Sequence, residues 1–208
     1  MHHEAGVLGA AVPVDIWKSR LKTLKSIGCN AIRTAHNPMS KEFLDLCDNM
    51  GILIQNEFFD ELDYAKDKRN NYHDRHDDYI TRGYVEHFQE WGKSDLERTM
   101  LRDRNHPSVF QWSIGNEIEW TYLHYRYVTG FWKDPNQPQN SGEYWGSAPM
   151  FSAEEMKKRY DKSEKGEYIL TETATKVNGW VKVLDTTRPT TANLVVPQTS
   201  LVSGYADA

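Results

Sequence analysis

The sequence predicts an α/β fold, in which the short strands of a parallel sheet alternate with helices along the chain. Segments of strand length are predicted at residues 29–34, 52–56 and 109–114, and segments with helical periodicity lie between them. The run at 52–56 is nearly continuous in apolar character, which is typical of a strand buried on both faces. Strands and helices in alternation indicate βαβ units, whose strands are parallel.

The first two helices have recognisable beginnings and ends. Pro13 suits the first turn of a helix, and Gly28 ends the helical spacing that follows it. Ser40 is a suitable N-cap for a second helix, and Gly51 closes that helix. The apolar residues expected to face the core are Ile16, Trp17, Leu21, Leu24 and Ile27 in the first helix, and Phe43, Leu44 and Cys47 in the second.

The rest of the chain combines further helices with two long irregular segments. Residues 84–104 and 167–184 are predicted to be helical, a capping box at 152–155 begins a short helix, and residues 190–195 form the last strand. The loops 58–83 and 119–151 both follow strands, so they lie at the same end of the sheet. Six aromatic residues of the second loop either shape substrate subsites or pack on one another. They are Tyr122, Tyr125, Tyr127, Trp132, Tyr144 and Trp145. The apolar face of the 84–104 helix comprises Val85, Phe88, Trp91, Leu96, Met100 and Leu101.

The bulk composition excludes several classes of protein. The 208 residues are 38% hydrophobic and 26% charged, with a net charge of −5, which is too modest to indicate a nucleic-acid or membrane partner. No run of 18 apolar residues and no secretory leader stands in the sequence, and the natural compartment stays open. The two cysteines, Cys29 and Cys47, are expected to be buried free thiols.

The segment 102–117 contains a predicted strand, which is followed by two polar residues. His106 and Pro107 prevent the preceding helix from continuing, and an apolar run begins at Val109. Asn116 and Glu117 follow directly where that run stops. The carboxyl ends of parallel strands are where α/β barrels place their catalytic groups, so this pair is the first candidate for a functional site.

Four segments, in order, carry a family resemblance. Asn-His-Pro-Ser-Val at 105–109 and Trp-Ser-Ile-Gly-Asn-Glu at 112–117 resemble the fourth barrel strand of glycoside hydrolase family 2, which includes β-galactosidases, β-glucuronidases and β-mannosidases. Residues 2–13 and 30–38 resemble the first and second strand regions of the same family, and residues 43–54 with 56–58 resemble its second helix and third strand. The resemblance is dense from His2 to Glu117 and thin after it.

The resemblance implies that residues 1–208 form a single partial catalytic domain. This domain would be part of a (β/α)8 TIM barrel, from the end of strand 1 through strand 5 or 6. The remainder of the barrel and flanking β-sandwich domains would belong to a longer protein. The isolated chain is therefore expected to be inactive and poorly stable, because an open half-barrel exposes sheet edges.

The implied activity is that of a retaining exo-glycosidase that hydrolyses terminal non-reducing β-glycosides, with β-D-galactosides as the first expectation. Glu117 takes the role of general acid/base, and the nucleophilic glutamate of the family stands on the seventh strand, beyond this chain. The alternatives are β-glucuronidase or β-mannosidase specificity, or a non-catalytic carbohydrate-binding fragment. The resemblance implies no cofactor, although some relatives hold a divalent cation.

The same resemblance assigns further residues to the sugar. Asn116 would hydrogen-bond the 2-hydroxyl, while His2, His36 and Asn37 at strand ends would contact other hydroxyls. Glu57 ends the third strand as Glu117 ends the fourth, and the residues alone would pair the two as nucleophile and acid. The family pattern instead makes Glu57 a supporting residue.

Two further expectations concern charge and metals. Arg33 is expected to face the barrel interior and to pair with a carboxylate, either Glu57 or Glu117, because a buried guanidinium needs a partner. A metal-dependent hydrolase, with His2, His3, His36 and Glu57 as ligands, is the minor alternative. No His-x-His or His-Glu-x-x-His spacing favours it.

Overall fold

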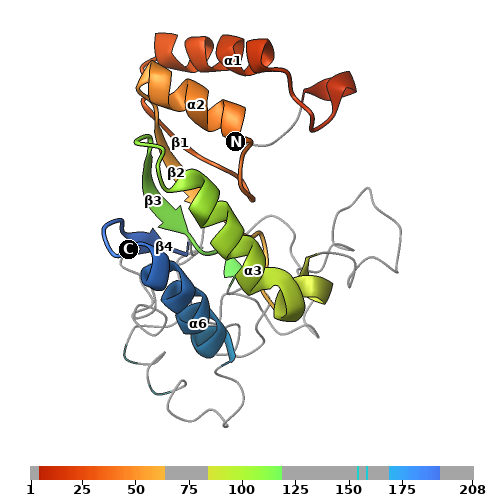
Figure 1. The fold of residues 1–208 in the computed structure, drawn as a ribbon, viewed down its shortest axis with the longest axis vertical. Coiled ribbons are helices and arrows are strands. Elements are labelled where there is room, and N and C mark those ends of the chain that lie inside the picture. The colour runs from red at the N-terminus through yellow and green to blue at the C-terminus, as the bar shows by residue number, and fades with distance from the viewer. Residues whose placement is uncertain (1–4, 64–83, 119–153, 155–157, 159–168, 193–208) are drawn as a thin grey trace.

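The computed structural model of the chain describes residues 5–63, 84–118, 154, 158 and 169–192, which form a parallel sheet with helices along one side (Figure 1). The strands are β1 (Ala31–Arg33), β2 (Leu53–Glu57), β3 (Val109–Ser113) and β4 (Thr190–Thr191). The helices are the 3-10 helix η1 (Gly6–Leu8) and the α-helices α1 (Val14–Ser26), α2 (Lys41–Met50), α3 (Val85–Asp103) and α6 (Ile169–Leu184).

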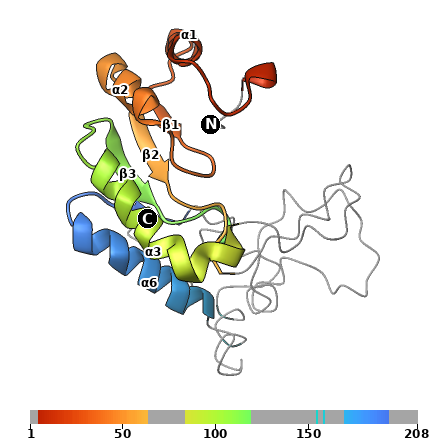
Figure 2. The same ribbon diagram turned by 45° about the vertical axis from the view of Figure 1, so that its right-hand side comes forward.

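The order of the strands distinguishes a barrel from a doubly wound sheet. The four strands are hydrogen-bonded in the sequential order β1-β2-β3-β4, and every pairing is parallel. Because each right-handed crossover then advances in the same direction, the connecting helices fall on one face of the sheet. Figure 2 shows α2, α3 and α6 following one another along that side. The chain is thus a partial (β/α) barrel, as predicted.

The predicted capping residues begin and end α2. The Ser40 hydroxyl accepts a hydrogen bond from the Phe43 amide at 3.3 Å, which satisfies one of the free N–H groups at the helix start. At the other end Gly51 adopts a left-handed conformation, with φ of 64°, which residues with a Cβ rarely adopt. The Trp17 ring then packs edge-on against the Phe43 ring, with centroids 5.0 Å apart, and this contact holds α1 on α2.

The hydrophobic core lies between the sheet and the helices. Phe88, Leu96 and Met100 of α3 are at most 1% exposed, and each such side chain contributes roughly 1.5–3 kcal/mol through burial. Two residues predicted to share this helix face are instead turned outward, Trp91 at 44% and Leu101 at 52% exposed. Both residues lie at the margins of the buried face of α3. That face is therefore narrower than predicted.

The face of the sheet turned away from the helices is polar, which corrects a second expectation. Leu53 on this face is 44% exposed, whereas its neighbours Ile52 and Ile54 are buried on the helix side. Gln55 of β2 donates to Gln111 of β3 at 3.1 Å across the same inner face. The strand β2 is therefore not apolar on both sides, because its inner face carries hydrogen-bonding side chains.

Other departures from the sequence-based expectations are smaller. Ile16 and Ile27 of the first predicted helix face are 36% and 76% exposed, and Phe110 in β3 is 40% exposed. Cys47 is buried, while Cys29 is only partly buried, and both are free thiols. The last strand is described over Thr190–Thr191 only, and residues 193–195 of the predicted strand lie outside the described part.

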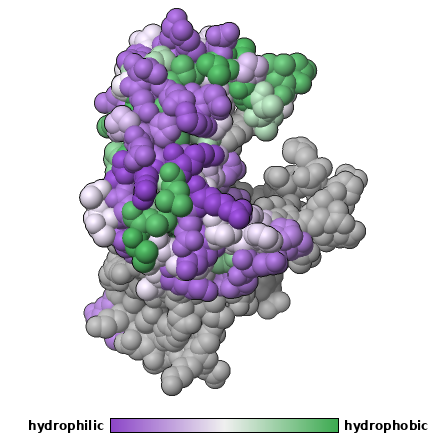
Figure 3. All heavy atoms as spheres, viewed as in Figure 1, coloured by the Kyte–Doolittle hydropathy of each residue, from purple (hydrophilic) through white to green (hydrophobic). Residues whose placement is uncertain are grey.

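The face of the molecule drawn in Figure 3 is largely hydrophilic, with some hydrophobic patches. Exposed apolar side chains of the helices include Val7 and Leu8 of η1, at 104% and 49%, and Val183 of α6, at 81%. Among the described residues, none of the helices is long and apolar enough to cross a membrane.

Two carboxylates, of the partly buried Asp48 and the buried Asp185, hold the two ends of β3. Asp48 of α2 accepts hydrogen bonds from His106 Nδ1 at 2.6 Å and from the Ser108 amide at 2.9 Å, which ties the loop before β3 to the helix layer. Asp185, after α6, accepts from Trp112 Nε1 at 2.9 Å and from Arg188 Nη1 at 2.7 Å. These hydrogen bonds hold both ends of β3 and so help to place the polar residues that follow it.

Candidate active site

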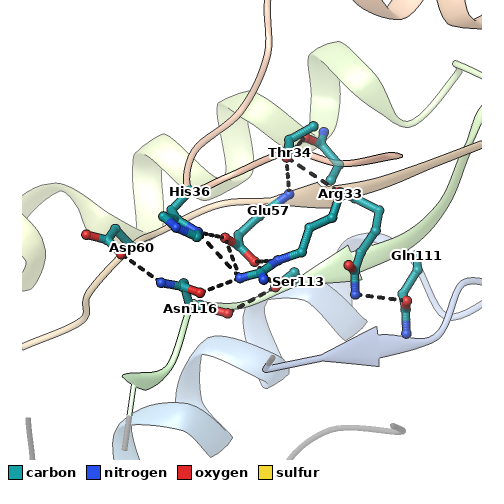
Figure 4. Close-up of polar contacts among 11 residues, drawn as sticks. Arg33, Thr34, His36, Glu57, Asp60, Gln111, Ser113 and Asn116 are labelled. Carbon is teal, nitrogen blue, oxygen red and sulfur yellow. Dashed lines mark hydrogen bonds and ion pairs between the residues drawn. The ribbon is translucent and has the colours of Figure 1, made fainter. Parts of the chain in front are cut away.

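Four polar side chains converge at the carboxyl ends of the first three strands (Figure 4). Arg33 is the last residue of β1, and His36 lies just beyond it. Glu57 is the last residue of β2, and Asn116 follows β3 after two intervening residues. Because the strands are parallel, all these positions meet at one edge of the sheet, which is the catalytic edge in α/β barrels.

The Glu57 carboxylate is the centre of this group. Its side chain is 0% exposed, and Arg33 holds it in a bidentate pair, with Nε to Oε2 at 2.9 Å and Nη2 to Oε1 at 3.1 Å. Ser113 Oγ donates to Oε2 at 2.9 Å. Of the two partners predicted for Arg33, the structure selects Glu57. The pairing satisfies a charge that would be costly to bury alone.

The sheet itself places Glu57 in this position. The Thr34 hydroxyl, at the end of β1, accepts a hydrogen bond from the Glu57 amide at 2.8 Å. The Thr34 amide in turn donates to the Gln55 carbonyl at 3.1 Å and continues the ladder between β1 and β2. Backbone and side chain of Thr34 together fix the register in which Glu57 faces Arg33.

His36 adds a third donor to the carboxylate. Its Nδ1 lies 2.9 Å from Glu57 Oε1 and 3.4 Å from Arg33 Nη2. Since a guanidinium only donates and a carboxylate only accepts, the shorter contact requires a proton on Nδ1. The imidazole is therefore oriented by Glu57, with its Nδ1–H directed at Oε1.

Asn116 joins the network through both ends of its amide. Its Oδ1 accepts from Arg33 Nη2, and its Nδ2 donates to Asp60 Oδ1 at 3.0 Å. The residue is only 3% exposed. Sequence reasoning did not assign Asp60 to the site, although its position three residues after Glu57, past the same strand end, was an available signal.

Glu117 stands next to Asn116 on a turn with unusual backbone geometry. Its φ is 46°, in the left-handed region that few non-glycine residues occupy, and its side chain is partly buried. Gly115 makes this turn sterically feasible, because a Cβ there would lie 2.4 Å from Ile118 Cγ2. Strained backbone of this kind is often found where a functional side chain is presented.

Of the other predicted site residues, Asn37 is described by the structure, and it does not join the network. Asn37 is exposed on the loop after β1. His2 and the aromatic residues of the 119–151 loop lie outside the described residues, so their placement stays a prediction. The structure thus brings together Arg33, His36, Glu57 and Asn116, with Glu117 adjacent in the chain.

Metal binding finds little support among the described residues. Asp45, Asp48 and His106 have ligand atoms within 4.8 Å of one another, but their contacts already have a structural explanation. Asp48 is satisfied by His106 and by the Ser108 amide, and Lys41 pairs with Asp45 at 2.8 Å. At the sheet edge the Arg33 guanidinium already contacts both His36 and Glu57, and a second cation there would be repelled.

The fold is a partial α/β barrel, and comparison with known proteins assigns the family. Residues 1–136 match the model of the TIM barrel domain of glycosyl hydrolases family 2, and the chain belongs to that family of O-glycosyl hydrolases. It is 39% identical to a β-galactosidase of Bacteroides ovatus over 197 residues, or 95% of this chain and 20% of that protein. It is 38% identical to a putative β-glucuronidase of Formosa agariphila over 117 residues, or 56% of this chain and 10% of that protein.

A solved structure agrees with the assignment. A glycosyl hydrolase family 2 member from Bacteroides cellulosilyticus superimposes on the whole chain with a TM-score of 0.66 and 28% identity, over 20% of its own length. The chain therefore spans about a fifth of the length of this structure and of the Bacteroides ovatus relative.

Proposed function

We propose that the chain is part of the catalytic barrel of a retaining exo-glycosidase that hydrolyses terminal β-glycosides, with β-D-galactosides as the first candidates. The observation that carries the proposal is the network of Arg33, His36, Glu57 and Asn116 at the sheet edge where Glu117 follows β3. The name of the Bacteroides ovatus relative supports the choice of galactosides.

Glu117 acts as the general acid/base in this proposal. In the first step its carboxylic acid protonates the glycosidic oxygen as the bond to the leaving group breaks, while a second carboxylate attacks the anomeric carbon. In the second step the Glu117 carboxylate takes a proton from water, which displaces that carboxylate. The second carboxylate belongs to a part of the barrel beyond this chain.

Glu57 is unsuited to be the nucleophile. Both of its oxygens already accept hydrogen bonds, Oε1 from Arg33 and His36 and Oε2 from Arg33 and Ser113. A nucleophile must reach the anomeric carbon, and a side chain with 0% exposure could do so only by turning outward, which would break these four hydrogen bonds. We assign Glu57 and Arg33 to holding the residues that contact the sugar.

The sugar contacts are assigned to the neighbouring residues. Asn116 hydrogen-bonds the 2-hydroxyl, a contact that strengthens in the transition state of glycoside hydrolysis. His36, Asn37 and His2 bind the other hydroxyls from the ends of the first strands.

A second specificity has a specific observation in its favour. The Formosa agariphila relative, at nearly the same identity as the galactosidase, carries the name putative β-glucuronidase. Glucuronides are therefore the second candidates, β-mannosides the third, and carbohydrate binding without catalysis is the remaining alternative.

The test uses the full-length protein that contains this chain. We expect it to release p-nitrophenol from one of three aryl glycosides, the β-galactoside, the β-glucuronide or the β-mannoside. Proton NMR of the first product should show the β-anomer, because two displacements retain configuration. Binding of sugar without turnover of any of the three would favour the non-catalytic alternative, and an initial α-anomer would exclude the retaining mechanism.

A further inference from the structure

We propose that Asp60 is a positioning residue, which orients the Asn116 amide so that Nδ2 donates its remaining hydrogen to the oxygen of the substrate's 2-hydroxyl. This inference rests on the proposed function, because it names the atom through which Asn116 meets a sugar. It assigns a role to Asp60 and a hydrogen-bonding polarity to Asn116.

Charges of opposite sign stand at the two ends of the Asn116 amide. The carbonyl oxygen Oδ1 accepts from the Arg33 guanidinium, which is always a cation and only donates. The amide nitrogen Nδ2 donates to Asp60 Oδ1 at 3.0 Å. A flipped amide would direct N–H groups at a guanidinium and a carbonyl oxygen at a carboxylate, so both contacts would become repulsive. Arg33 and Asp60 therefore select a single orientation of the amide.

The selected orientation determines what Asn116 can offer a ligand. A primary amide nitrogen has two hydrogens, and Asp60 accepts only one of them. The second hydrogen is the donor available to a substrate. Without Asp60 the guanidinium still holds Oδ1, but the nitrogen loses the acceptor that fixes the plane of the amide, and the second hydrogen loses its direction.

The segment that carries Asp60 has its own anchors. Phe58, Phe59 and Leu62 are at most 6% exposed, and the Phe58 ring stacks on Trp112 with centroids 5.4 Å apart. Asp63 accepts a hydrogen bond from the Thr173 hydroxyl at 2.7 Å, which joins the segment to α6. Removal of the Asp60 carboxylate should therefore change the partner of Asn116 more than it changes the path of the backbone.

The test compares two substrates in the full-length enzyme, the aryl β-glycoside that it cleaves and the 2-deoxy analogue of that glycoside. Asp60→Ala should lower kcat/KM for the parent substrate on the order of tenfold to a hundredfold, as expected for one lost polar contact in the transition state. The same variant should change kcat/KM for the 2-deoxy substrate by less than about threefold. Asp60→Asn keeps the volume and an acceptor oxygen, so its loss should be smaller and confined to the parent substrate.

Two comparisons separate positioning from folding. In an Asn116→Ala background, Asp60→Ala should have no additional effect, because the residue it orients is gone. Asp63→Ala is the matched control in the same segment, and any loss it causes should be equal for the two substrates. Equal losses on both substrates for Asp60→Ala and Asp60→Asn, or additive losses with Asn116→Ala, would overturn the inference.

Failure of this inference is distinguishable from failure of the proposed function. If Asn116→Ala discriminates between the two substrates and the Asp60 variants do not, only the role of Asp60 is wrong. If Asn116→Ala itself affects both substrates equally, the 2-hydroxyl contact is wrong, and the inference falls with it. A wild-type enzyme that cleaves none of the aryl glycosides overturns both.

Discussion

Neutralising Glu57 is the perturbation whose cost the structure defines most completely. In the Glu57→Gln variant one carboxylate oxygen becomes an NH2 group of nearly the same size. Each oxygen of Glu57 accepts a hydrogen bond from Arg33, so in either orientation the new NH2 group faces a guanidinium N–H, and the Arg33 cation loses its carboxylate partner. Removing one partner of a buried ion pair costs about 3–5 kcal/mol, and because the Arg33 side chain is 35% exposed we expect a destabilisation of about 3 kcal/mol, at the low end of that range.

Urea unfolding of the full-length protein, followed by tryptophan fluorescence, measures this cost, because Trp112 lies on β3 next to Ser113. Glu97→Gln provides the matched control. Glu97 is ion-paired with Lys93 at 3.7 Å, but it is 37% exposed on α3, so the same substitution should cost less than about 0.5 kcal/mol. If Glu57→Gln also costs less than about 1 kcal/mol, the buried network does not hold this edge of the sheet.

Three further predictions follow from single contacts. Gly115→Ala places a Cβ 2.4 Å from Ile118, so it should lower stability by about 1–3 kcal/mol and reduce kcat/KM; unchanged values of both would contradict the turn geometry. Burial alone would raise the pKa of Asp185, but hydrogen bonds from Thr187, Trp112 and Arg188 hold that pKa below its ordinary value. The stabilisation is therefore present above roughly pH 4 and is lost at lower pH, and the unfolding free energies of wild type and Asp185→Asn should converge on acidification; a pH-independent difference would refute this. Burial, with the nearby Asp48 carboxylate, raises the pKa of Cys47 to about 12, so iodoacetamide at pH 8 should leave that thiol unmodified, and stoichiometric labelling of the folded protein would contradict its burial.

Much of the fold was predictable because local signals and tertiary packing agree. Ser40 and Gly51 define α2 by capping alone, and the structure places the helix between them. The alternation of strands and helices was sufficient to predict the parallel sheet, since few topologies satisfy that order. The exposure of the Trp91 and Leu101 side chains was not predictable from periodicity, because an apolar residue at the margin of a helix face can lie toward the core or toward solvent.

Most residues of the candidate site were predictable from the sequence, but the hydrogen bonds that join them were less so. Strand ends indicated Glu57, Asn116 and Glu117, and a buried guanidinium indicated a carboxylate partner for Arg33. The choice between Glu57 and Glu117 depended on the register of β1 against β2, which sequence does not specify at single-residue resolution. The hydrogen bond between Asp60 and Asn116 joins two segments 56 positions apart, and no local sequence pattern predicts such a contact.

The acid/base role of Glu117 is measured with the Glu117→Gln variant of the full-length enzyme, assayed with an activated aryl glycoside in the absence and presence of azide. We predict that kcat of the variant is lower than that of the wild type by a factor on the order of 10²–10⁴, because the attack of water on the glycosyl-enzyme loses its general base. Azide needs no base, so it should restore turnover and yield the β-glycosyl azide. Wild-type kcat in the variant, or a loss that azide does not relieve, would contradict the role of Glu117 as the acid/base.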